Sequence, residues 1–409
     1  QSVCHGSLHR PELPVNLNSN GLETTFRRVL FFFFCGSGHG AFDHVHQLQR
    51  GLDGLFFPLF ADRRCDLGRV ALFAVVKQNA FEFFLCVSVC QFHQANIISA
   101  LRNVNMGFVS KLLTYVFEPV ARRKGVSGGD TALACVRKLR AGKTVGLFAE
   151  GETTWDGKTA EIFSATGRLA QMGKCRLITY RLEGAYFTAP RWGKGIRRGK
   201  MYGRIVGIYS AEEVKAMGKD ITAVIQRDIY EDADLRQQEA PVAYGKGHLA
   251  ENLEVMLFKC PACGAYESLS SKGNFLRCTC GKQWEFTTFG RFTPAEPFET
   301  VAQWDAWQRQ QLEGENPAFR AEGLQLSLLG DEHDQQILGT GALELKEGAL
   351  HCCGQIFPVE EISSMALITT KRLLFTVGNS YYELKAKKPL CLRKFLLCWQ
   401  KIAAKEPMM

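Results

Sequence analysis

From residue 99 onward, apolar and polar positions alternate with periods that predict helices and strands in turn. Apolar residues recur at helical spacing in Gly107 to Phe117 and in Asp130 to Arg140, where Asp130 is a suitable N-cap. Thr144 to Phe148 is a short apolar run typical of a buried strand. A helix near Gly167 to Met172 and a strand at Arg176 to Tyr180 are expected next. Strands that alternate with helices indicate an α/β fold with a sheet flanked by helices.

The last third of the chain follows a different pattern. Val301 to Glu313 is predicted to be an amphipathic helix with Trp304 and Trp307 on one face, and Glu315 to Gly323 has the composition of a linker. Short strands and a closing helix then follow, an order that resembles a small PH- or GRAM-like β-domain. The expected elements are strands at Leu324–Leu329, Gly341–Leu345, Ile362–Ile368, Leu373–Val377 and Tyr381–Leu384, and a helix at Leu390–Ala404.

Residues 1–98 have an anomalous composition. They contain one lysine and no tryptophan, tyrosine or methionine, yet hold 14 of the 29 phenylalanines. No helical or strand period is sustained there. A genuine domain of unusual composition would explain this, but we favour a segment that is diverged or translated out of frame. The N-terminal Gln is further expected to mark an incomplete or artificial start.

Composition and charge limit the class of protein. Hydrophobic residues make up 46% of the chain and charged residues 22%, which describes a folded protein and not a disordered one. The formal charge of +9 suits an anionic partner or serves only solubility. The 15 cysteines do not form a disulfide framework, and neither a signal peptide nor a spanning helix is evident, since Ala71 to Val89 is interrupted by polar residues. We expect a cytoplasmic protein, peripheral at the inner face of the cell membrane.

Three sequence blocks carry a family resemblance. Phe148 to Gly157 reads FAEGETTWDG, Pro119 to Arg122 reads PVAR, and Thr179 to Trp192 is a strand leading to a proline. In order and spacing these blocks resemble those of the glycerophospholipid acyltransferases, the superfamily of bacterial-type 1-acyl-sn-glycerol-3-phosphate acyltransferase. The resemblance covers about residues 99–256.

The resemblance implies an activity and a set of binding residues. Such an enzyme moves an acyl chain from a thioester donor, acyl-CoA or acyl carrier protein, to the sn-2 hydroxyl of 1-acyl-sn-glycerol 3-phosphate in phospholipid synthesis. Arg122 is the expected contact of the acceptor phosphate, since a guanidinium binds phosphate bidentately. Glu150 and Gly151 are expected to help hold the glycerol phosphate. The alternatives are a solvated basic turn at residues 122–124 and a structural carboxylate at Glu150.

The sequence departs from the family pattern at the residues that carry out catalysis. The family uses a His-x4-Asp pair as general base and orienting carboxylate, and none of the nine histidines here has Asp five residues later. By spacing the motif belongs near residues 70–85, where Ala74 to Phe84 has no histidine. Ala149 and Thr153 replace a family proline and arginine. No catalytic residue is therefore assigned, activity is expected to be impaired, and the alternative is a catalytically inactive lipid- or partner-binding homologue.

Two further features point to partners and a metal. Arg191 to Arg204 holds six basic residues and no acid, which favours an anionic membrane surface or a solvated hairpin; nucleic acid is not expected, because no nucleic-acid-binding motif accompanies the segment. Cys260, Cys263, Cys278 and Cys280 have the spacing of a structural zinc ribbon, with all four ligand positions filled. Cys352, Cys353, Cys391 and Cys398 are expected to be packing residues.

These patterns divide the chain into five expected parts. Residues 1–98 form the anomalous segment, 99–256 the acceptor-binding acyltransferase core, 257–292 the zinc ribbon, 293–319 a helix and linker, and 320–409 the β-domain with its terminal helix.

Overall fold

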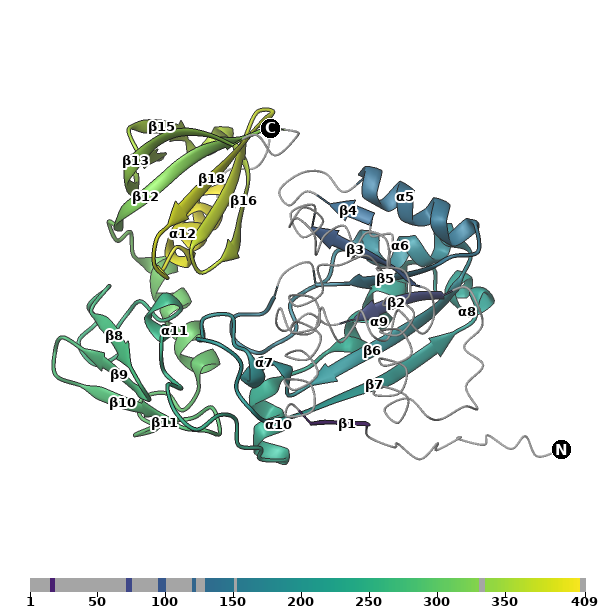
Figure 1. Ribbon diagram of the computed structural model, residues 1–409, viewed down its shortest axis with the longest axis horizontal. Coiled ribbons are helices and arrows are strands. Elements are labelled where there is room, and N and C mark those ends of the chain that lie inside the picture. The colour runs from purple at the N-terminus through teal and green to yellow at the C-terminus, as the bar shows by residue number, and fades with distance from the viewer. Residues whose placement is uncertain are drawn as a thin grey trace, which may run out of the picture.

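The computed structural model describes residues 129–150, 153–330 and 335–404, together with Val120 and the backbone of short strands at 15–18, 71–75, 95–100 and 120–122. Within these residues the chain is a mixed α/β protein with three sheets (Figure 1). We name them the mixed sheet (β1 to β7), the cysteine sheet (β8 to β11) and the C-terminal sheet (β12 to β18). In Figure 1 the cysteine sheet and the C-terminal sheet lie on one side of the mixed sheet, with helix α11 between them.

The mixed sheet has the strand order β1-β7-β6-β2-β5-β3-β4. Strands β2 to β6 run parallel to one another, whereas β7 is antiparallel to β6 and to β1. The strands are β1 (Val15–Asn18), β2 (Ala71–Val75), β3 (Ala95–Ala100), β4 (Val120–Arg122), β5 (Thr144–Phe148), β6 (Arg176–Glu183) and β7 (Lys200–Tyr209).

Helices pack beside this sheet and beside one another. The core between them is formed by apolar residues of α5, β5, α6, β6 and α9, all buried in one cluster. The helices are α5 (Gly129–Arg140), α6 (Ser164–Gly173), α7 (Ala185–Thr188), α8 (Ala211–Ala216), α9 (Ile221–Ile229) and α10 (Ala233–Glu239).

The predicted elements of this unit are confirmed where the structure describes them. Helix α5 buries Cys135, Val136 and Leu139 at helical spacing, and the first four residues of β5 are buried, as an interior strand requires. Helix α6 begins three residues before the predicted start, and β6 runs on to Glu183. The helix predicted at 107–117 lies outside the described residues.

The cysteine sheet is small and antiparallel, in the order β11-β10-β9-β8. Its strands are β8 (Leu269–Lys272), β9 (Phe275–Cys278), β10 (Gln283–Phe286) and β11 (Phe292–Thr293). The sheet packs on α11 (Val301–Gly314), which confirms the predicted helix. Thr300 and Gln303 cap α11 reciprocally, and the fully buried Trp304 lies edge-on to Trp284 at 4.9 Å between ring centroids.

The C-terminal sheet is antiparallel with the order β15-β14-β13-β12-β18-β17-β16, and α12 (Arg393–Ala403) packs on it. The predicted linker at 315–323 is wrong at its end, because β12 already begins at Arg320 and pairs with β13. The strands are β12 (Arg320–Leu329), β13 (Gln335–Lys346), β14 (Ala349–Cys352), β15 (Gln355–Pro358), β16 (Ile362–Thr369), β17 (Arg372–Val377) and β18 (Ser380–Ala386).

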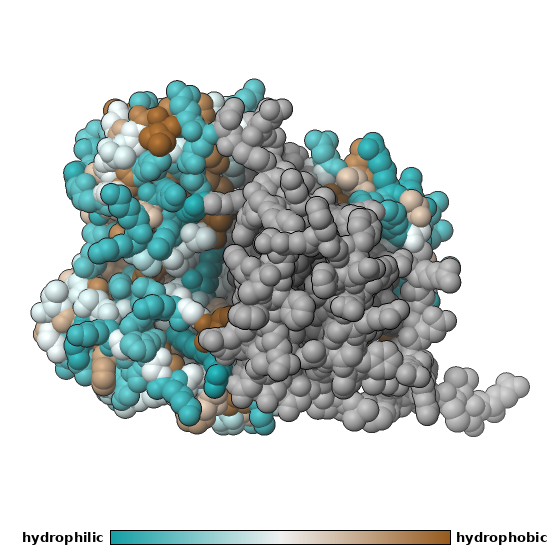
Figure 2. All heavy atoms as spheres, in the orientation of Figure 1, coloured by the Kyte–Doolittle hydropathy of each residue, from teal (hydrophilic) through white to brown (hydrophobic). Residues whose placement is uncertain are grey.

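No helix among the described residues is both long and apolar enough to cross a membrane. The apolar stretch that starts at Ala71 begins with the five-residue strand β2. In Figure 2 hydrophilic and hydrophobic residues are interspersed over the coloured part of the surface.

Candidate functional site

The carboxyl ends of β2 to β6 lie along one edge of the mixed sheet, because these strands are parallel. Ile97 of β3 lies opposite Gly146 of β5, and Ala100 of β3 lies opposite Arg122 of β4. The pairing of β3 with β5 ends at Ile97 and Gly146. Continued by three residues, the same register would bring Arg122 level with Ala149, the residue before Glu150, with about 10 Å between the two backbones across β3. Two of the three predicted acceptor residues thus belong to the same sheet edge.

Glu150 follows β5 and is only 3% exposed. Its Oε2 accepts a hydrogen bond from the backbone N–H of Ala160 at 2.8 Å, which closes the intervening loop at its base. This contact agrees with the interpretation of Glu150 as a structural carboxylate. Gly151 and the side chain of Arg122 lie outside the described residues, so their roles stay predictions.

The loop after Glu150 makes a tight turn over the short helix α7. Thr154 Oγ1 donates to Asp156 Oδ1 at 3.0 Å and accepts from the Gly157 N–H at 3.1 Å. Gly157 has a φ of +87°, and a Cβ atom there would lie 2.8 Å from the Tyr186 ring. Only glycine fits this position without a shift of the loop or the ring.

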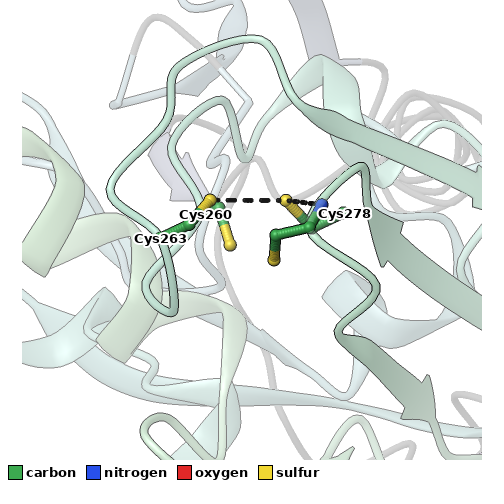
Figure 3. Close-up of side chains that lie close together, drawn as sticks. Cys260, Cys263 and Cys278 are labelled. Atoms are coloured by element: carbon green, nitrogen blue, oxygen red, sulfur yellow. Dashed lines mark hydrogen bonds between the residues drawn. The ribbon is translucent and has the colours of Figure 1, made fainter.

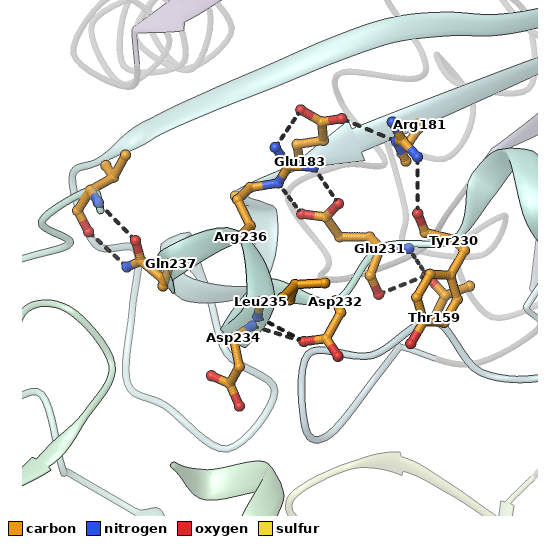
Figure 4. Close-up of polar contacts among 12 residues, drawn as sticks. Thr159, Arg181, Glu183, Tyr230, Glu231, Asp232, Asp234, Leu235, Arg236 and Gln237 are labelled. Carbon is orange, nitrogen blue, oxygen red and sulfur yellow. Dashed lines mark hydrogen bonds and ion pairs between the residues drawn. The ribbon is translucent and has the colours of Figure 1, made fainter. Parts of the chain in front are cut away.

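Two buried carboxylates near the end of β6 form an ion-pair network that the sequence analysis missed (Figure 4). Glu183 pairs with Arg181 at 3.0 Å, Arg204 at 2.7 Å and Arg236 at 2.9 Å. Arg236 also donates two hydrogen bonds to Glu231, at 2.6 and 2.8 Å. Burial raises the pKa of Glu231, while Arg236 opposes that rise. The only sign of this network in the sequence was Glu183, a glutamate at the end of strand β6.

Three of the six basic residues in the segment 191–204 are engaged within the protein. Arg197 is buried, donates to the Leu249 carbonyl at 2.6 Å and lies over the Trp192 ring at 4.9 Å from its centroid. Burial lowers the pKa of Arg197 to about 10. This residue holds two segments of the core together and is not available to a lipid headgroup.

Arg191 and Arg204 of this segment also make contacts within the protein, whereas Lys194 is exposed. Arg204 belongs to the Glu183 network, and Arg191 donates to two backbone carbonyls. Lys194 is 71% exposed and lies 3.2 Å from Glu251. The alternative of a solvated hairpin therefore fits the exposed Lys194 and not Arg191, Arg197 and Arg204, which have internal contacts.

Four cysteine sulfurs converge between two turns of the cysteine sheet (Figure 3). The Sγ atoms of Cys260, Cys263, Cys278 and Cys280 all lie within 4.8 Å of one another, and those of Cys263 and Cys278 are 3.7 Å apart. A tetrahedron of thiolates with metal–sulfur bonds of about 2.3 Å has edges of about 3.8 Å. The four side chains predicted as ligands are thus brought together at a spacing that fits a metal ion.

A glycine follows each cysteine pair. Gly264 and Gly281 have φ of +73° and +90°, which the tight turns require. The pKa values of the thiols differ: burial raises the pKa of Cys260 to about 12, whereas in Cys278 burial is outweighed by hydrogen bonds from the Cys280 amide and with the Ser268 hydroxyl, which lower the pKa to about 6. Metal binds the thiolate form, so binding would release the protons that the thiols with a raised pKa still hold.

The remaining cysteines of the C-terminal part are packing residues, as predicted. Cys352 and Cys391 are buried in the core of the C-terminal sheet, and Cys353 and Cys398 pack against it. Within the described ranges, the group at 260–280 is the one set of Cys, His, Asp and Glu side chains that could hold a metal ion.

The described histidines do not replace the missing general base. His248 is exposed and its Nδ1 lies 2.7 Å from Glu251, before the cysteine sheet. His351 lies on β14 of the C-terminal sheet. Neither belongs to the strands that form the carboxyl edge of the mixed sheet.

Comparison with known proteins gives a partial likeness among solved structures. No family model and no curated protein matches the chain. Among solved structures, the chain is similar to the 1-acyl-sn-glycerophosphate acyltransferase PlsC from Thermotoga maritima, with 17% sequence identity over 50% of this chain and 86% of that one, at a TM-score of 0.36. A likeness of that size carries no argument about activity, which rests on the residues themselves.

Proposed function

We propose that the carboxyl edge of the mixed sheet binds the glycerol phosphate of 1-acyl-sn-glycerol 3-phosphate, and that the chain is an acyltransferase-type protein of phospholipid synthesis. The observation that carries this proposal is the strand register, which, continued from Gly146, would bring Arg122 level with the residue before Glu150. In parallel α/β sheets this edge is where ligands bind, because the connecting loops converge there.

The residue chemistry suits a phosphate-bearing acceptor. Arg122 would bind the phosphate through two parallel N–H···O bonds, with Arg123 and Lys124 adding positive potential. Gly151 would let the backbone approach the ligand closely. Glu150 would hold the base of the loop through the Ala160 N–H and so fix the level at which the glycerol lies.

Acyl transfer at this edge requires a base that the sequence does not supply in the family's pattern. The sn-2 hydroxyl oxygen attacks the thioester carbonyl of acyl-CoA or acyl carrier protein, the thiolate leaves, and the hydroxyl proton must be accepted. Absence of a general base costs about 10²–10⁴ in rate. We therefore propose slow or impaired turnover with the acceptor site retained.

The missing His-x4-Asp pair favours a second candidate, a catalytically inactive homologue that binds lipid or a protein partner. The two candidates share the acceptor site and differ in whether the bound acceptor is acylated. Product formation therefore discriminates between them, whereas acceptor binding alone does not.

The four cysteines would hold one zinc ion with a structural role. All four tetrahedral positions are filled by thiolates, so no position is open to substrate. Contact with an anionic membrane surface would be peripheral, at the inner face of the cell membrane, and would use the exposed Lys200 and not the engaged arginines.

The test combines turnover and binding in zinc-loaded protein. Phosphatidate is quantified by mass spectrometry after incubation with a long-chain acyl-CoA and 1-acyl-sn-glycerol 3-phosphate, and Arg122→Ala is compared with Arg137→Ala. Arg137 is exposed in the last turn of α5, far from the carboxyl edge, so it controls for the loss of one charge.

Slow product formation that Arg122→Ala abolishes and Arg137→Ala preserves supports the enzyme. Saturable acceptor binding without product above background supports the inactive homologue. Wild-type protein that neither binds the acceptor nor forms product contradicts the proposal.

A further inference from the structure

One partly buried side chain of the loop after Glu150 packs against both units appended after the mixed sheet, the cysteine sheet with α11 and the C-terminal sheet with α12. Trp155 packs against the hydrophobic core of the C-terminal sheet and also against the core formed by the cysteine sheet and α11. Because this loop starts at the proposed acceptor site, its conformation depends on two units that lie outside the mixed sheet.

Arg191 joins the loop to the C-terminal sheet. Its Nη1 donates to the Thr153 carbonyl at 2.9 Å and its Nη2 donates to the Leu367 carbonyl of β16 at 2.6 Å. The same guanidinium lies over the Trp155 ring, 4.3 Å from its centroid. A planar guanidinium can serve two carbonyls and an aromatic face at once, which an ammonium group cannot do.

The helices of the appended units contact the same turn. Arg393 at the start of α12 lies 5.6 Å from the Trp155 ring centroid and forms a buried ion pair with Asp305 of α11. Arg309 of α11 lies 3.9 Å from Asp156 of the loop. Two helices that are distant in sequence therefore meet over residues 155 and 156.

The mixed-sheet unit holds the loop from the other side. Tyr186 is fully buried, donates to the Trp155 carbonyl at 3.1 Å and accepts from Trp192 Nε1 at 3.1 Å. The loop is thus fixed between α7 below and α11, α12 and β16 above. Loss of the upper contacts would free the turn while its lower anchor remains.

We propose that Arg191 and Trp155 are positioning residues, through which the C-terminal sheet and α11 set the conformation of the acceptor-binding loop. This inference rests on the proposed acceptor site and assigns the appended units a role in it. An acceptor at the sheet edge would bind a loop that is already ordered, so undocking of the C-terminal sheet would weaken acceptor binding without removing any residue that contacts the acceptor.

Amide hydrogen exchange of residues 153–160 reads out the loop directly. The amides of Gly157 and Lys158 donate hydrogen bonds to Thr154 Oγ1 and Asp156 Oδ1 within the turn, so their exchange reports its opening. The amides of Thr159 and Ala160 donate to the Glu231 carbonyl and to Glu150 Oε2, outside the turn, and report its anchors. The variants are Arg191→Ala, the conservative Arg191→Lys and the control Lys194→Ala, which removes an exposed charge of the same segment. Affinity for 1-acyl-sn-glycerol 3-phosphate is measured on the same full-length, zinc-loaded proteins.

In Arg191→Ala we expect exchange of the Gly157 and Lys158 amides to rise about tenfold to a hundredfold, as loss of two charge-assisted hydrogen bonds implies, and acceptor affinity to fall by at least about tenfold. Arg191→Lys should recover part of both effects, and Lys194→Ala should resemble wild type. Exchange in β9 and β10 should stay unchanged, which separates loop opening from general unfolding.

Unchanged exchange in Arg191→Ala would overturn the proposal, as would increased exchange with unchanged acceptor affinity. Should Arg191→Ala fail to fold, Trp155→Phe keeps an aromatic side chain, removes part of the indole contact with Arg191 and the two cores, and is measured in the same way. If wild-type protein does not bind the acceptor, the proposed function fails; increased exchange in Arg191→Ala would still support the positioning of the loop by the C-terminal sheet.

Discussion

The ion pair between Asp305 and Arg393 gives the sharpest stability prediction, because it joins α11 to α12. Asp305 is fully buried, and its Oδ2 accepts from Arg393 Nη2 at 2.8 Å while its Oδ1 accepts from Nη1. Gln308 Nε2 donates to the same carboxylate at 2.8 Å, and Arg309 Nε lies 3.0 Å from it. Replacement of Asp305 by alanine leaves the buried guanidinium of Arg393 without a counter-ion.

Removal of one partner from a buried pair costs about 3–5 kcal/mol, so the unfolding equilibrium constant of the α11–α12 region should rise about a hundredfold to several thousandfold. Asp305→Asn keeps an acceptor oxygen but not the charge, and should cost less. The double variant Asp305→Leu/Arg393→Met removes both charges and should recover at least about 2 kcal/mol of the loss. Urea unfolding followed by tryptophan fluorescence measures these differences, because Trp304 adjoins Asp305.

Arg320→Ala is the matched control, since Arg320 is 60% exposed and its ion pairs with Glu322 and Glu344 at the surface should contribute little. A free energy of unfolding for Asp305→Ala within about 1 kcal/mol of wild type would refute the reasoning, as would a double variant no more stable than the single one.

Three further predictions follow from other sites. Gly157→Ala should lower the free energy of unfolding by more than about 1 kcal/mol in urea titrations, because its φ is positive and the Cβ would meet the Tyr186 ring; a neutral effect would contradict this. Burial raises the pKa of Asp234 to about 6, so wild type loses stability as pH rises from about 4 to 6, when the unfolded carboxyl ionises first. Asp234→Asn should therefore gain about 1–3 kcal/mol relative to wild type at pH 7.5 and little at pH 4, and equal differences at both pH values would be inconsistent with burial. Cys263→Ser should reduce bound zinc, measured by mass spectrometry, from one equivalent to well below one and lower the melting temperature of the cysteine sheet, whereas Cys352→Ser should leave zinc unchanged.

The local pattern of apolar and polar residues predicted the helices and strands in which that pattern alone determines which side is buried. The helix at 129–140 and the strand at 144–148 were found because one side of the helix, and nearly the whole strand, are apolar. The cysteine site was found because ligand spacing within two short turns determines its geometry. In each case the deciding contacts lie close together in the sequence.

Contacts between distant segments were not predictable in the same way. Strands β14 and β15 are four residues each, too short for a clear period, and they are held by pairing of β14 with β13 and of β15 with β14. The Glu183 network joins residues from β6, β7 and α10. The roles of Arg191 and Arg197 depend on carbonyls far along the chain, which the composition of the basic segment could not reveal.

Binding of the acceptor phosphate at the carboxyl edge is the central claim, and ³¹P NMR titration of 1-acyl-sn-glycerol 3-phosphate tests it most directly. We expect a saturable change in the phosphorus shift with wild type and with Arg137→Ala, and at least about a tenfold weaker response with Arg122→Ala, as loss of a bidentate phosphate contact implies. An unsaturable response with wild type, or equal affinities for wild type and Arg122→Ala, would contradict the account.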